Sequence, residues 1–174
     1  GDLDAASGVE VLMHAALPLL DDGRVESLVV IGDGPERARL ERMAAISGQS
    51  RRITLLGRRS RTEMLREMAR AAVLAVPSTV PASAPPGALE ALGVGRPIVA
   101  TRLGGLPELI EDLRSGRLVE PGDAAGLADA LSWVLEDDAR RESLSLRAAA
   151  AAARFGIARS AADLEGHYAA VTGP

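Results

Sequence analysis

The sequence contains no cysteine, which excludes disulfide bonds and metal sites built on thiolates. It also has few aromatic residues, with one Trp, one Tyr and one Phe among 174 residues. The hydrophobic core must therefore be built from Ala, Leu, Val and Ile. Because a chain without cysteine suits a reducing compartment, we expect a cytoplasmic location.

Two further absences concern membranes and nucleic acids. No apolar run reaches the ~18 residues of a transmembrane helix, and the first residues, GDLDAASG, lack the basic start and apolar stretch of a signal peptide. The arginines are spread along the chain, the net charge is −4, and no basic stripe alternates with aromatic residues. We therefore expect no transmembrane segment and no nucleic-acid partner.

The sequence does contain a regular alternation of short apolar runs and segments with helical periodicity. The run Leu28–Ile31 is uniformly apolar, as in a strand covered on both faces, whereas apolar residues recur at helical spacing between Val9 and Leu20. This alternation predicts one α/β domain over residues 1–174, with a Rossmann-like parallel sheet and helices on both faces. The predicted strands are residues 28–31, 53–56, 73–76, 97–101 and 117–119. The predicted helices are residues 9–20, 35–46, 124–136, 139–155 and 160–171, with two more beginning after Ser60 and near Glu90.

Two of the predicted helices carry distinctive residues near their start. Ser60, followed by Glu63 three residues later, has the pattern of a capping box. Glu90 follows Pro85-Pro86-Gly87 and is expected in the first turn of its helix, where the helix dipole favours a carboxylate. Glu90 therefore has a structural explanation as well as a functional one.

Two glycine-rich turns are candidates for binding an anion. Gly32-Asp33-Gly34-Pro35 and Gly104-Gly105 each follow a predicted strand and precede a predicted helix. Backbone N–H groups in such turns can hold a phosphate, and an open α/β sheet binds its ligand at the carboxyl ends of its strands. The glycines are also explained by tight turns alone, so both interpretations stay open.

The order of the motifs between Pro77 and Asp123 is more specific than any one of them. The stretch contains Pro77-Ser78, Glu90-Ala91-Leu92, Gly95-Arg96-Pro97, Gly104-Gly105-Leu106-Pro107-Glu108 and Pro121-Gly122-Asp123. Upstream, the turn at Gly32 and the pair Leu56-Gly57 agree with the same pattern. The series resembles the C-terminal, nucleotide-sugar-binding half of retaining glycosyltransferases of family 4, which have the two-domain GT-B fold.

The resemblance implies a function for such a domain. It would bind a UDP-, GDP- or ADP-linked sugar as donor substrate, with no metal and no other cofactor, and the acceptor would be held by a separate N-terminal domain. That domain and the first strand of the present one are absent from this chain, which we interpret as an excised half of a larger enzyme or a natural fragment. We therefore expect no activity from the chain alone, and the missing half could attach the enzyme peripherally to a membrane.

The resemblance also implies a set of binding residues. Glu90 is expected to accept hydrogen bonds from the ribose hydroxyls, a task that suits the two oxygens of a carboxylate. The backbone after Leu56-Gly57 is expected to contact the base. The complete set of implied donor-binding residues is Gly32, Gly34, Leu56, Gly57, Arg58, Ser78, Glu90, Gly104 and Gly105.

Three positions depart from the family pattern. Asp2 and Ser7 stand where the family has an Arg and a Lys that neutralise the departing diphosphate. Ala82 stands where the family has a Glu near the donor sugar. Asp2 would place a negative charge beside a negative ligand, which opposes the electrostatic stabilisation that this chemistry needs.

These departures leave two functional hypotheses. In the first, the chain is the donor-binding domain of an active glycosyltransferase, and Arg58, Arg59 or Arg102 reaches the phosphates instead, although each is also explained as solvated surface. In the second, the chain is a non-catalytic nucleotide-binding or structural relic of the same fold. Another doubly wound nucleotide-binding enzyme fits the series from Glu90 to Asp123 less well.

Overall fold

The computed structural model of the chain describes residues 2–81, 86–156 and 168. The strands are β1 (Leu28–Ile31), β2 (Ile53–Gly57), β3 (Leu74–Val76), β4 (Ile98–Thr101) and β5 (Gly116–Val119). The helices are η1 (Ala5–Ser7), α1 (Val9–Asp21), α2 (Arg37–Ile46), α3 (Arg61–Arg70), α4 (Pro86–Gly93), α5 (Leu106–Leu109), α6 (Ala124–Leu135), α7 (Asp138–Ala152) and η2 (Ala153–Phe155). All five predicted strands are confirmed, as are the predicted helices of this part of the chain. Apart from residue 168, the helix predicted at residues 160–171 lies outside the described residues, and so does Ala82.

The five strands are parallel but form two sheets, whereas the sequence predicts one. β1 pairs with β2, and β3, β4 and β5 form the second sheet in that order. Within the described residues, β1 and β3 therefore each have a partner strand on one side only. Periodicity indicates which segments are strands but not which strands pair, so the sequence does not predict this division.

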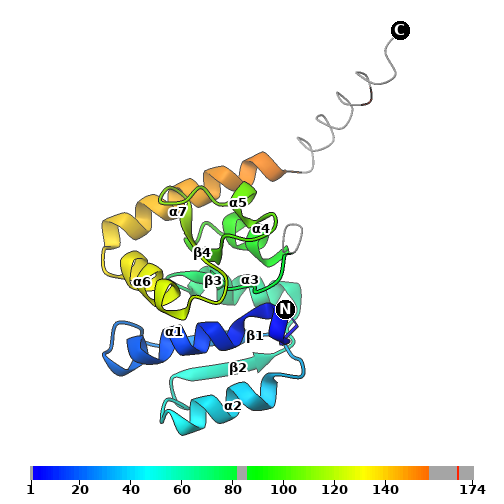
Figure 1. The fold of residues 1–174 in the computed structure, drawn as a ribbon. Helices are drawn as coiled ribbons and strands as arrows, with labels where there is room; N and C mark the ends of the chain where they lie inside the picture. Colours follow the sequence, from blue (N-terminus) through cyan, green and yellow to red (C-terminus); the bar gives the residue numbers. More distant parts are fainter. Residues whose placement is uncertain (1, 82–85, 157–167, 169–174) are drawn as a thin grey trace.

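Helix α1 packs against both sheets and connects them (Figure 1). One stripe of the helix is buried with β4, β5 and α6 through Leu12, Ala15 and Leu19. The neighbouring stripe is buried with β1, β2 and α2 through Met13, Ala16 and Leu20. α1 can serve both sheets because its apolar surface is wider than the single stripe of an ordinary surface helix.

The three-stranded sheet is covered by helices on both faces, as predicted. Val99 and Val119 lie on the face covered by α1 and α6. Ile98, Ala100 and Leu118 lie on the opposite face, with α4, α5 and α7. All four residues of β4 are buried, which agrees with the nearly uniform apolar sequence of a central strand in a parallel sheet.

The starts of α3 and α4 test two local predictions. The capping box of α3 is confirmed, since Ser60 Oγ accepts a hydrogen bond from the N–H of Glu63 and the Glu63 carboxylate accepts one from the N–H of Ser60. The prediction that Glu90 lies in a first turn is wrong, because α4 begins at Pro86 and Glu90 is its fifth residue. Proline is well suited to the first helical position, where no backbone N–H is needed. The helix dipole therefore does not explain the carboxylate at residue 90.

Candidate functional site

The loops that follow β1 and β2 meet at the carboxyl ends of these strands. The N–H of Gly32, directly after β1, donates to the carbonyl of Gly57, the last residue of β2, at 3.0 Å. Leu56 is half-buried in β2, one residue before this contact. Three of the predicted site residues are thus brought together at one edge of the domain.

Residues 2–8 continue this edge. Asp2 forms a parallel β-bridge with Asp33, and the N–H of Leu3 donates to the carbonyl of Asp33 at 3.0 Å. The backbone of Leu3 also passes directly over Gly34, where an added Cβ would lie 2.5 Å from the Leu3 carbonyl oxygen. Glycine at this position is therefore required by the close approach of two backbone segments.

The loop after β3 is attached to the same segment. The N–H of Thr79 donates to the carbonyl of Ala6 at 3.0 Å. Gly8, at a φ of +67°, lies so close to Pro77 that an added Cβ would be 1.8 Å from the Pro77 carbonyl oxygen. Ser78 sits between these two contacts, so it belongs to the same edge as the loops after β1 and β2.

The turn after β4 contains Gly104 and Gly105. It lies beside the end of β3, because Val76 of β3 is opposite Ala100 of β4 in the parallel register. In the described part of the chain, no hydrogen bond uses the N–H of Gly104 or Gly105 as its donor. These two groups are therefore available to an anion, and they lie in the turn that leads into the single-turn helix α5.

The turn after β1 differs in this respect. The N–H of Gly32 is used by the carbonyl of Gly57, and the N–H of Gly34 donates to the Asp33 carboxylate at 2.9 Å. The Asp33 carboxylate thus binds the N–H of Gly34, a group that the sequence predicts would bind an anionic ligand. Both glycines remain predicted site residues, but their N–H groups have internal partners here.

Arg58 is the predicted cation that faces this edge. Its Nη2 lies 3.0 Å from Oδ1 of Asp2, and both side chains are mostly exposed. Arg59, the second candidate cation, donates through Nη1 to the carbonyl of Arg58 at 3.0 Å. Arg102, the third, is bound by Asp112 at 3.0 Å and Glu120 at 3.6 Å, so it is turned toward β5 and the residues around it. Of these three cations, Arg58 is the one bound to residue 2 at this edge.

Glu90 is bound by a residue that was not among the predicted site residues. Nε of Arg61 lies 3.0 Å from Oε1 of Glu90, and the Glu90 side chain is only 16% exposed. Arg61 is the first residue of α3, directly after the Ser60 cap and three residues after Arg58. Its place directly after the loop that follows β2 is the sequence signal that could have drawn attention to it.

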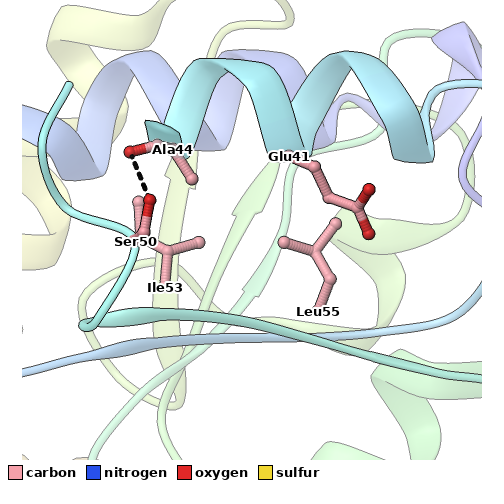
Figure 2. Close-up of a pocket in the computed structure, with 5 residues that line it drawn as sticks. All are labelled: Glu41, Ala44, Ser50, Ile53 and Leu55. Atoms are coloured by element: carbon pink, nitrogen blue, oxygen red, sulfur yellow. Dashed lines mark hydrogen bonds between the residues drawn. The ribbon is translucent and has the colours of Figure 1, made fainter. Parts of the chain in front are cut away.

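Two hollows of the described part of the chain lie elsewhere. One, of about 250 Å³, is lined by Glu41, Ala44, Ser50, Ile53 and Leu55 between α2 and β2. Figure 2 shows these residues and the hydrogen bond from Ser50 Oγ to the carbonyl of Ala44. The other, of about 220 Å³, lies between residues 111–115 and α7. Neither is lined by a predicted site residue, so the candidate site is the open edge formed by the strand ends.

Residues 1–137 match the family described as glycosyl transferases group 1. The chain belongs to this family. The predicted resemblance to GT-B glycosyltransferases is thereby confirmed, together with the α/β fold of parallel strands flanked by helices.

Two curated relatives and one solved structure illustrate the relationship. The chain is 35% identical to D-inositol 3-phosphate glycosyltransferase of Corynebacterium jeikeium strain K411, over 97% of this chain and 42% of that protein. It is 32% identical to alpha-D-kanosaminyltransferase of Streptomyces kanamyceticus, over 97% of this chain and 44% of that protein. Anabaena HepE in complex with UDP and glucose is 26% identical with a TM-score of 0.80, over 88% of this chain and 42% of the other. The chain thus spans less than half the length of each of these three proteins.

Two general features of this group 1 glycosyltransferase chain complete the description. None of the helices in the described ranges has both the length and the apolar character needed to cross a membrane. In the same ranges, His, Asp and Glu side chains form no cluster of three suited to a metal ion.

Proposed function

We propose that this chain is the donor-binding domain of a retaining glycosyltransferase that transfers a sugar from a nucleotide diphosphate sugar. The observation that carries the proposal is the gathering of Gly57, Arg58, Ser78 and the Gly104 turn at one edge, in a chain of this family. The UDP and glucose bound to the similar HepE structure support the same donor chemistry. The acceptor would be held by a part of the enzyme outside this chain.

The ribose, the base and the diphosphate of the donor would each have a matching group at this edge. The ribose hydroxyls would donate to the carboxylate of Glu90. The base would lie against the backbone at Gly57 and Arg58. The free N–H groups of Gly104 and Gly105, together with the Arg58 guanidinium, would hold the diphosphate and stabilise the negative charge that develops as the glycosidic bond breaks. In this proposal the protein's own hydrogen-bond donors and cations stabilise the diphosphate, and neither a metal nor a further cofactor is used.

A non-catalytic role is the second candidate, and a specific observation favours it. The Asp2 carboxylate lies 3.0 Å from Arg58 and so neutralises the cation best placed to compensate for the missing family arginine. Asp33 adds a second negative charge in the turn after β1, where its carboxylate accepts from the N–H of Gly34. A domain with this charge distribution would bind a nucleotide diphosphate weakly, as expected of a relic that keeps the fold.

Isothermal titration calorimetry of the chain with UDP, GDP and ADP tests the proposal. We expect one of the three to bind more tightly than the others, because the backbone at Gly57 and Arg58 would select the base. Binding without sugar transfer by the full-length protein would favour the non-catalytic role. Absence of binding to all three would contradict the donor-binding function. For the intact enzyme we propose a cytoplasmic location, where nucleotide sugars would be its donors.

A further inference from the structure

The ion pair between Arg61 and Glu90 joins two groups in very different surroundings. The Glu90 side chain is 16% exposed, whereas the Arg61 side chain is 76% exposed. A polar group largely removed from water is costly unless it has a hydrogen-bonding partner. Arg61 provides that partner through Nε at 3.0 Å from Oε1.

The backbone of Arg61 is fixed where this contact is made. Ser60 and Glu63 close the capping box on either side of it, with the Ser60 N–H donating to Glu63 Oε2 at 2.9 Å. The first turn of α3 is thereby held in place, although α3 itself contains no buried residue. The backbone of Arg61 is therefore held in place by the capping box while its guanidinium binds Glu90.

We propose that Arg61 is a positioning residue for ribose recognition. Its guanidinium binds Oε1 and fixes the rotation of the Glu90 carboxylate, while Oε2 has no hydrogen-bond partner among the described residues. A carboxylate whose orientation is already set loses less freedom when it accepts hydrogen bonds from a ligand. This inference rests on the proposed donor-binding function.

A purely structural role makes a different prediction. If Arg61 only tied α3 to α4, its loss would loosen the edge and weaken every ligand equally. A positioning role acts through Glu90 alone, so it affects only ligands that carry ribose hydroxyls. The comparison of a ribonucleotide with its dideoxy counterpart separates the two roles.

The test measures the affinity of UDP, GDP and ADP, each with its 2′,3′-dideoxy counterpart, by calorimetry. We compare the unchanged chain with Arg61→Ala, Arg61→Lys and the control Arg70→Ala, which removes an exposed arginine from the same helix. We expect Arg61→Ala to weaken the ribonucleotide about tenfold, the effect of one charge-assisted hydrogen bond, and the dideoxy form less than about twofold. Arg61→Lys should recover part of the affinity, and Arg70→Ala should leave it unchanged. Thermal unfolding of each variant verifies that the chain is folded.

The outcomes separate this inference from the function on which it rests. Binding of none of the three diphosphates by the unchanged chain would overturn the proposed function, and the role of Arg61 with it. Ribose-dependent binding that Arg61→Ala leaves unchanged, or weakens equally for both forms, would overturn the positioning role alone. Tighter binding after Arg61→Ala would also overturn it, because Arg61 would then compete with the ribose.

Discussion

Oδ1 of Asp2 lies 3.0 Å from Nη2 of Arg58, across 56 positions of sequence. In related glycosyltransferases the residue at the position of Asp2 is expected to be an arginine that binds the diphosphate. Here the residue is acidic, and it also engages the nearest cation that could act in its place. The positive charge at this edge is therefore reduced in two ways. An acidic residue replaces an arginine, and that residue also neutralises Arg58.

The first prediction concerns this charge. The double substitution Asp2→Arg and Ser7→Lys removes one negative charge, adds two positive charges and releases Arg58 from its partner. Each new charge pair near the surface contributes about 1 kcal/mol, so we expect a nucleoside diphosphate to bind at least about tenfold more tightly. Calorimetry at low and high salt measures the gain, which should fall as salt increases.

The matched comparison for the double substitution is the nucleoside monophosphate. It should gain less than the diphosphate, since it carries less negative charge. Equal gains for both ligands, or no gain, would mean that residues 2 and 7 do not face the phosphates. The case for a relic would then lose its main support.

The second prediction concerns Glu90. Substitution of Glu90 by Gln keeps the size of the side chain but removes the charge that accepts from the ribose and from Arg61. We expect nucleotide affinity to fall about tenfold, as for the loss of a hydrogen bond to a charged acceptor. The control is Glu142→Gln on an exposed part of α7. Unchanged affinity after Glu90→Gln, measured by calorimetry, would rule out the ribose role.

The third prediction concerns the contact of Gly8 with Pro77. In Gly8→Ala the new methyl group would lie 1.8 Å from the Pro77 carbonyl oxygen, and the residue would keep a φ of +67° that is unfavourable for alanine. We expect a loss of unfolding free energy of about 3 kcal/mol, measured by urea denaturation. Gly48→Ala has a similar φ of +73° but no atom within 4 Å, so it should cost only about 1 kcal/mol. Similar losses for both would show that the backbone conformation, and not the close approach, matters.

The fourth prediction concerns the pH dependence of the α3 capping box. Hydrogen bonds from the Ser60 side chain and backbone hold the pKa of Glu63 below its ordinary value of 4.5. Because the pKa is lower in the folded than in the unfolded chain, the charge of Glu63 stabilises the fold above about pH 4.5. This contribution disappears as the pH falls through the folded pKa.

We therefore expect Glu63→Gln to lower the free energy of unfolding at pH 7 and to have little effect near pH 3. Urea denaturation of both proteins at the two pH values provides the measurement. A difference that stays constant with pH would mean that the charge of Glu63 is not what stabilises the start of α3.

Local features of this protein could be predicted from its sequence. The five strands, the extent of α1 and the Ser60–Glu63 capping box all depend on residues within a few positions of one another. The family was also recognisable, because its motifs are short and their order along the chain is preserved. Glu90 was placed in the wrong turn since the start of α4 depends on which of the preceding residues enters the helix.

The tertiary structure alone decided how these pieces meet. The division into two sheets joined by α1 follows from strand pairing and from packing between distant segments. The same holds for the pair of Asp2 with Arg58 and for that of Arg61 with Glu90, whose members are 56 and 29 positions apart. The periodicity of apolar residues and the capping of helices depend on residues a few positions apart, so both can be predicted from the sequence. The partner of a charged side chain depends on where the whole chain brings it, and so it appears only once the chain is folded.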